Sequence, residues 1–128
     1  MRKQCHNPYM PLWEHVPDGE PHVFGDRLYV FGSHDLENGN EFCEQDYVCW
    51  SAPVKDLSDW RCDGVIYKKE QDPYNQDALP LYAPDVVKGP DGRYYLYYCI
   101  KFQDSINVAV CDTPAGEYRF YGRVHYED

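Results

Sequence analysis

Positively charged side chains are scarce in this chain of 128 residues. Only 12 lysines and arginines stand against 22 aspartates and glutamates, which gives a formal net charge of −10. A surface this acidic repels phosphate backbones, so nucleic acid is a poor partner.

Long hydrophobic runs are also missing. No apolar stretch approaches the length of a membrane span, so we expect no membrane partner. The first eight residues lack the apolar run that a signal peptide needs. This pattern predicts a soluble protein with a cytoplasmic location.

The six cysteines lack the spacing of a metal site. They form no CxxC pair and do not cluster with histidine at zinc spacings. Cys49, Cys99 and Cys111 instead lie in apolar, strand-like runs, where a free thiol behaves as a small hydrophobe. We therefore expect reduced, structural cysteines and assign neither a metal nor a cofactor.

A helical period is absent from every segment, whereas aromatic residues make up 16% of the chain. Short apolar runs separated by turn residues recur along the sequence instead, which is typical of an all-β protein. The turns contain Gly25-Asp26 and Gly89-Pro90-Asp91-Gly92, which suit tight connections. The predicted strands cover residues 21–24, 27–32, 47–51, 61–67, 84–88, 93–100, 107–111 and 117–124.

The two halves of the chain resemble each other. Residues 21–31 match residues 85–97 at an offset of about 65 residues, and each half holds four predicted strands, as one propeller blade does. We place the first blade at about 18–67 and the second at about 82–125. The polar segment between them, residues 68–81, is expected to be a solvated loop.

Several segments carry a resemblance to a known family. The first is Asn7-Pro8 followed by residues 17–24, and the second is Ser51 with Asp56-Leu57-Ser58-Asp59-Trp60. The third is Tyr82-Ala83-Pro84-Asp85-Val86 with residues 91–98, and the fourth is residues 105–110 with Asp112-Thr113-Pro114-Ala115-Gly116. In this order, and over nearly the whole chain, the four segments are similar to the motifs of family 43 glycoside hydrolases. The resemblance implies an all-β fold made of about two blades of a five-bladed β-propeller. A five-bladed ring would need roughly 325 residues at this repeat length.

The resemblance also implies an activity, the inverting hydrolysis of xylosyl or arabinofuranosyl linkages in plant polysaccharides or oligosaccharides. Two carboxyl groups flank the scissile bond in such enzymes, one activating water and one protonating the leaving oxygen. The family adds a third carboxylate, which orients the acid and tunes its pKa. By position, Asp18 would be the general base and Asp85 this third carboxylate.

Two points depart from the family pattern. The family usually has its base directly before proline, whereas Gly19-Glu20 intervene here, so Glu20 is the alternative base. The family's general acid is a glutamate on the third blade, and this sequence ends at Glu127-Asp128, near the end of the second. We therefore expect a chain that stops before the general acid and that is inactive alone.

Three further residues are candidate substrate contacts. Trp13, before Asp18, is placed to stack on a sugar ring or to cover the propeller rim. His34, at the end of the second predicted strand, is placed to reach the cavity or to cap a turn. Tyr82 lies close to Asp85, where family members often have an aromatic residue.

Two other functions remain open. A catalytically inactive propeller fragment would bind carbohydrate or self-associate through its exposed blade edges. A fructan-cleaving five-bladed family also has an early aspartate, but Ala83-Pro84-Asp85-Val86 fits that family less well.

Overall fold

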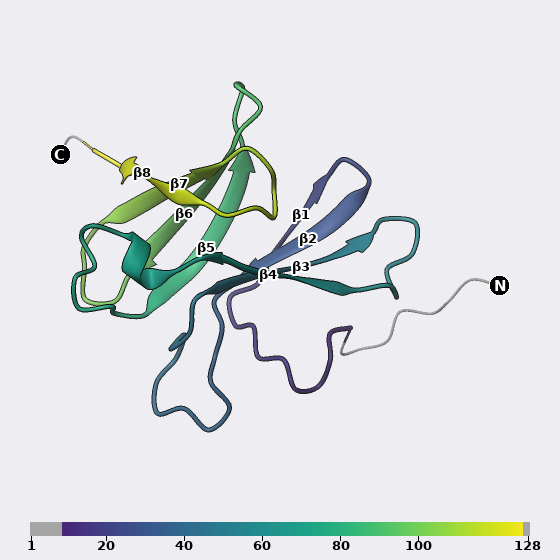
Figure 1. Cartoon of the computed structure of the whole chain (residues 1–128), viewed down its shortest axis with the longest axis horizontal. Helices are drawn as coiled ribbons and strands as arrows, with labels where there is room; N and C mark the ends of the chain where they lie inside the picture. The colour runs from purple at the N-terminus through teal and green to yellow at the C-terminus, as the bar shows by residue number, and fades with distance from the viewer. Residues whose placement is uncertain (1–8, 127–128) are drawn as a thin grey trace.

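The computed structural model describes residues 9–126. Its eight strands form two four-stranded antiparallel sheets, each with its strands in sequence order. Figure 1 shows the first sheet on the side of the N-terminal label and the second on the side of the C-terminal label. The first sheet consists of β1 (Glu20–Phe24), β2 (Arg27–Gly32), β3 (Tyr47–Pro53) and β4 (Arg61–Tyr67). The second consists of β5 (Leu81–Lys88), β6 (Tyr94–Ile100), β7 (Ile106–Cys111) and β8 (Arg119–Arg123).

Every predicted strand is present, and the largest difference lies in β5. This strand begins at Leu81, before the predicted start, and runs through Pro84. Its register with β6 shifts between Tyr82 and Asp85, and Ala83 adopts a φ of 44°. The shift and the edge position of β5 explain how a strand accommodates proline, which cannot donate a ladder hydrogen bond.

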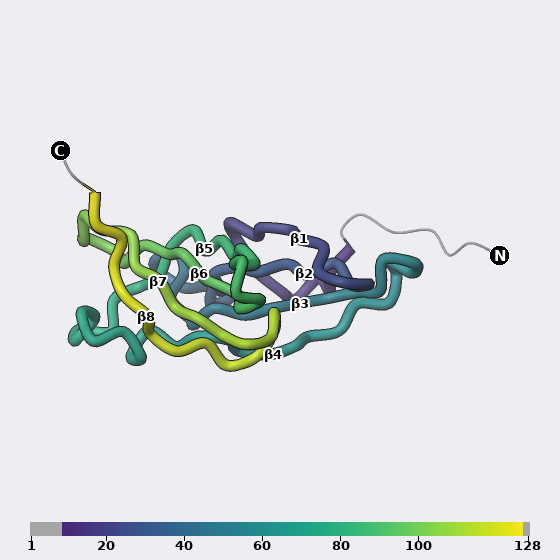
Figure 2. Tube along the Cα trace, turned by 90° about the horizontal axis from the view of Figure 1, so that it is seen from above, coloured from purple at the N-terminus to yellow at the C-terminus, as the bar shows by residue number. Residues whose placement is uncertain are grey.

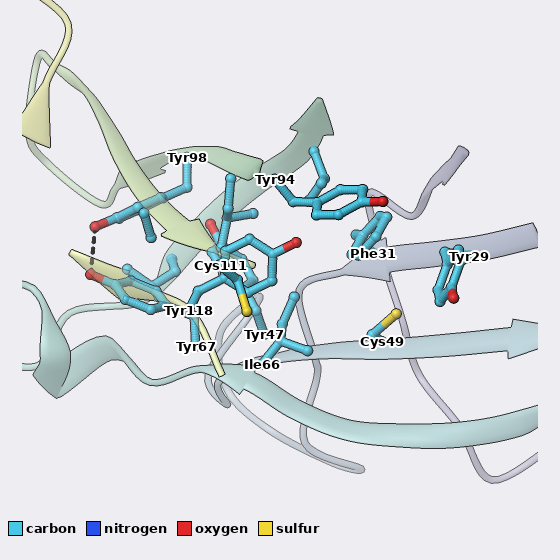
Figure 3. Packing of buried hydrophobic residues seen from close by; sticks show 14 of the residues in the cluster. Tyr29, Phe31, Tyr47, Cys49, Ile66, Tyr67, Tyr94, Tyr98, Cys111 and Tyr118 are labelled. Atoms are coloured by element: carbon cyan, nitrogen blue, oxygen red, sulfur yellow. Dashed lines mark hydrogen bonds between the residues drawn. The ribbon is translucent and has the colours of Figure 1, made fainter. Parts of the chain in front are cut away.

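The two sheets share a single core, which Figure 3 shows from close by. Phe31 and Tyr47 contribute from the first sheet, and Leu96 and Tyr98 from the second, each with at most 1% of its surface exposed. Burying side chains of this size stabilises the fold by roughly 1.5–3 kcal/mol each. Figure 2 shows the two sheets lying next to each other along the molecule. Because both sheets bury one face in the same core, they form a single packed unit.

The connection between the sheets is not simply a solvated loop. Within residues 68–81, Asp72 is 2% exposed and Asn75 is 3% exposed, so the prediction is wrong for these two residues. The segment forms a short 3-10 helix, η1 (Lys69–Gln71), and the Gln71 side chain donates to the Tyr118 carbonyl at 2.8 Å. The connection therefore packs against the second sheet.

The segment before β1 covers the face of the first sheet opposite the shared core. Trp50, which is buried, has its ring 5.9 Å from that of Trp13, and Tyr9 lies 5.0 Å from Trp60. Val16 packs directly against Gly32. It leaves no room for a side chain at position 32, because a Cβ there would lie 1.9 Å from Val16 Cγ1. This packing holds the residues just before β1 against the end of β2.

The described cysteines are free thiols. Cys43, Cys49 and Cys111 are buried, Cys99 is half-buried and Cys62 is exposed. Cys5 and the Asn7-Pro8 motif lie outside the described residues, as does Glu127. Within residues 9–126, no helix has the length and apolar character to cross a membrane.

Candidate active site

The site lies where the first strands of the two sheets contact each other. Asp85 stands in β5 between buried Pro84 and Val86, and its own side chain is exposed. This alternation follows from the period of two in a strand, which turns neighbouring side chains to opposite faces. Asp85 therefore points away from the core while its neighbours anchor the strand.

His22 of β1 joins the two sheets at this point. Its Nε2 lies 2.6 Å from Asp85 Oδ1, and its ring stacks on Phe24 at 5.7 Å between centroids. Phe24 packs in turn against Tyr94 of β6, edge to face, at 5.0 Å. His22 was not predicted as a site residue. The signal was its position two residues after Glu20, which places both side chains on one face of β1.

Glu20 completes a group of three possible ligands. The nearest donor atoms of Glu20, His22 and Asp85 all lie within 4.8 Å of one another. Carboxylate oxygen and imidazole nitrogen are ligands for divalent cations. In the part of the chain that the structure describes, these three residues could therefore hold a metal ion, and sequence reasoning did not bring them together.

Asp18, the preferred base, lies in the turn just before β1. It is exposed and adopts a φ of 53°, in the left-handed region that aspartate visits more readily than most residues. Within residues 9–126, the three-residue group contains Glu20 but not Asp18. The two candidate bases thus differ in position, and their roles stay predictions.

The three predicted substrate contacts lie in different surroundings. Trp13 is 67% exposed, with its ring against Trp50. His34 is paired with Glu14, its Nε2 lying 2.7 Å from Glu14 Oε1. Tyr82 is half-buried, and its carbonyl accepts a hydrogen bond from the Tyr47 hydroxyl at 2.7 Å. Trp13 has the exposure that stacking on a sugar requires, whereas His34 already has a protein partner.

Two adjoining four-stranded meanders with one core define the chain as two blades of a β-propeller. Residues 15–127 match the sequence model of Glycosyl hydrolases family 43. The chain belongs to this family.

Named relatives agree with that assignment. The chain is similar to a xylosidase/arabinosidase from Thermoclostridium stercorarium, with 63% identity over 129 residues, covering 100% of this chain and 27% of the relative. Its structure is similar to the GH43_1 enzyme from Xanthomonas citri complexed with xylotriose, with a TM-score of 0.71, 26% identity, and coverage of 88% of this chain and 33% of that enzyme. A β-xylosidase/α-arabinofuranosidase from a compost microbial metagenome, also complexed with xylotriose, gives a TM-score of 0.70 and 26% identity over 94% of this chain and 38% of that enzyme.

The chain spans only part of these proteins, between 27% and 38% of their length. This share fits two blades of a five-bladed fold.

Proposed function

We propose that this chain provides the first two blades of a glycosidase that hydrolyses xylosyl or arabinofuranosyl linkages with inversion. The observation that carries the proposal is the contact between β1 and β5, which brings Asp85, His22 and Glu20 to one exposed point. Family membership and the names of the relatives support the same reaction.

Each residue would have a distinct role in this reaction. The His22 hydrogen bond fixes the direction of the Asp85 carboxylate, and the strand register fixes its position. A carboxylate at the start of β1, Asp18 with Glu20 as the alternative, would take a proton from the attacking water. The proton for the leaving oxygen would come from an acid elsewhere in the closed ring, so this chain alone is expected to be inactive.

Substrate binding would use the rim around these carboxylates. The exposed Trp13 ring offers an apolar face of the kind that stacks on a pyranose or furanose. Tyr82, at the start of the bulge that precedes Asp85, would border the sugar that is cleaved. The proposed substrates are xylo- or arabino-oligosaccharides, since structures with similar folds hold xylotriose.

A second candidate function rests on the exposed face of the second sheet. Val87, Tyr97 and Tyr121 are 49%, 39% and 57% exposed, and together with Tyr95 they line one pocket. An apolar face of this kind favours association with another blade or a second copy. In this alternative the chain is a non-catalytic module that binds carbohydrate or itself.

The test uses the chain alone and a chimera, in which the chain replaces the aligned stretch of the Thermoclostridium stercorarium relative. Hydrolysis of nitrophenyl β-xyloside and nitrophenyl α-arabinofuranoside is measured for both, together with native mass. We expect an active chimera. We expect Asp85→Asn to lower kcat about 10²- to 10⁴-fold, because the acid that Asp85 would orient and tune would lose its contribution to proton transfer.

Two further variants identify the base. A large loss in Asp18→Asn with little change in Glu20→Gln assigns the base to Asp18, and the reverse assigns it to Glu20. Asp26→Asn, in the turn between β1 and β2, is the matched control. A folded chimera without activity would contradict the glycosidase proposal, and self-association of the chain would then favour the second candidate.

A further inference from the structure

A second carboxylate–histidine pair lies outside the group around Asp85. The Glu14 side chain is 3% exposed, and its two oxygens have different partners. Oε1 lies 2.7 Å from His34 Nε2, and Oε2 accepts a hydrogen bond of 2.8 Å from Trp50 Nε1. The His15 amide also donates to Oε1, at 2.9 Å. A carboxylate this buried is costly unless such donors compensate it. No step of the proposed reaction uses it.

The pair belongs to a set of contacts that dock the segment before β1 onto the end of β2. The Asp35 amide donates to the His15 carbonyl at 2.9 Å, and the Ser33 hydroxyl donates to the Pro17 carbonyl at 3.0 Å. Val16 fills the space above Gly32. Backbone, side-chain and packing contacts thus alternate along residues 14–17.

The docked segment leads directly into the turn that carries the candidate bases. Asp18 follows Pro17 at once, in its left-handed conformation, and Glu20 begins β1. A non-glycine residue keeps such a conformation only where the surrounding structure enforces it. The contacts at residues 14–17 hold one end of the turn, and the β1–β2 ladder holds the other.

We propose that Glu14 and His34 form a positioning pair, which fixes the turn of Asp18 and Glu20 so that the general base faces the attacking water. The inference rests on the proposed function and adds to it, because neither residue touches the reacting atoms. It also gives His34 a role other than the predicted substrate contact. Displacing a catalytic group by about 1 Å can cost about 10²-fold in rate.

The variants His34→Gln and Glu14→Gln are measured in the chimera, with His15→Gln as the control, because the exposed His15 is a close neighbour in the sequence. We expect kcat to fall about 10- to 100-fold in both variants while KM changes less than about twofold, since positioning the base affects the chemical step and not binding. His15→Gln should keep kcat within about twofold. A substrate contact at His34 would raise KM instead, which would overturn the proposal.

A double substitution separates positioning from a general loss of folded protein. The background is whichever of Asp18→Asn and Glu20→Gln removes the base. If His34 acts through the base, adding His34→Gln to that variant should lower its residual kcat no further. Equal losses in both backgrounds would overturn the proposal. If Asp85→Asn lowers activity and the Glu14 and His34 variants do not, only this inference fails, whereas full activity in Asp85→Asn is evidence against the proposed function itself.

Hydrogen exchange in the 128-residue chain provides a measurement that needs no activity. Because the Asp35 amide donates to His15, losing the pair should speed exchange at Asp35 more than tenfold while the amides of β6 stay unchanged. The same variants should also shift the indole N–H signal of Trp50, which donates to Glu14. Unchanged exchange and an unchanged Trp50 signal in His34→Gln would overturn the proposal.

Discussion

Replacing Asp72 by asparagine should destabilise the protein markedly, although the two side chains have nearly the same shape. Asp72 is 2% exposed and accepts hydrogen bonds at both oxygens. Oδ2 accepts from the Tyr98 hydroxyl and, at 2.7 Å, from Asn107 Nδ2, while Oδ1 accepts from the Tyr74 amide at 2.7 Å. All three partners are donors, so the site requires two acceptor oxygens.

The size of the effect follows from what asparagine cannot do. Its amide group has one acceptor oxygen, and its NH₂ must face donors, so at least one buried donor loses its partner at a cost of about 1–3 kcal/mol. The remaining bonds lose the extra strength that a charged acceptor provides. Some relief comes from the Tyr67 hydroxyl, 2.8 Å from that of Tyr98, which offers an alternative acceptor. We expect a net loss of about 2–4 kcal/mol, a large part of the 5–15 kcal/mol that typically stabilises a domain.

Urea unfolding followed by circular dichroism measures this loss directly. The midpoint for Asp72→Asn should fall by about 1–2 M at an m value near 2 kcal/mol/M. Asp77→Asn is the control, because Asp77 is an exposed acid in the same connection. A stability for Asp72→Asn within about 0.5 kcal/mol of that control would refute the argument that buried donors surround this carboxylate.

The other predictions concern groups whose titration or reactivity the fold alters. Burial raises the pKa of Tyr98 above its ordinary value of 10.0, so the contribution of the protonated Tyr98 to stability is complete below pH 10 and is lost as the pH rises above 10. Urea midpoints between about pH 8 and 11 should therefore fall less steeply with pH in Tyr98→Phe than in the unchanged protein. Equal slopes would count against the raised pKa. Hydrogen bonds from Tyr95 and Arg93 lower the pKa of Asp91 from its ordinary value of 3.8 to about 2. The contribution of the ionised Asp91 to stability is therefore present above pH 3.8 and is lost as the pH falls toward 2. Carbon NMR titration of Tyr95→Phe should place that pKa nearer 3.8, and an unmoved pKa would show that Tyr95 is not the cause. Cys62 is exposed while Cys49 is buried with a raised thiol pKa, so peptide mapping after brief alkylation should find Cys62 modified first, and equal labelling would contradict the described burial.

The strands were predictable because their signals are local. Alternating apolar residues and turn residues marked all eight, and the glycines at two of the turns adopt the positive φ expected of them, 64° at Gly25 and 81° at Gly92. The start of β5 was missed because a proline such as Pro84 usually stands at the first residue of a strand. Here the register shift between Tyr82 and Asp85 and the edge position of β5 let the strand begin before it. Local pattern cannot reveal such a shift, since it depends on pairing with β6.

The site was predictable only in part. Asp85 was found because its motif stands without gaps in one short segment. His22 was missed, because its partner lies 63 residues away in the other sheet, and its position two residues after Glu20 indicates only that the two side chains share one face of β1. His34 was noticed as a polar residue at a strand end, but its pairing with the buried Glu14 depends on how the first segment folds back over β2.

The sequence by itself determined the class of fold, the order of the eight strands and the family, because periodicity, turn chemistry and motifs act over a few residues. The tertiary structure decided which side chains meet: His22 with Asp85, Glu14 with His34, and Asp72 with Tyr98 and Asn107. The first pairing depends on the shared apolar core, which fixes the relative position of the two blades. The second depends on how the segment before β1 folds over β2, and the third on how the connection packs against the second sheet, where buried polar groups need partners.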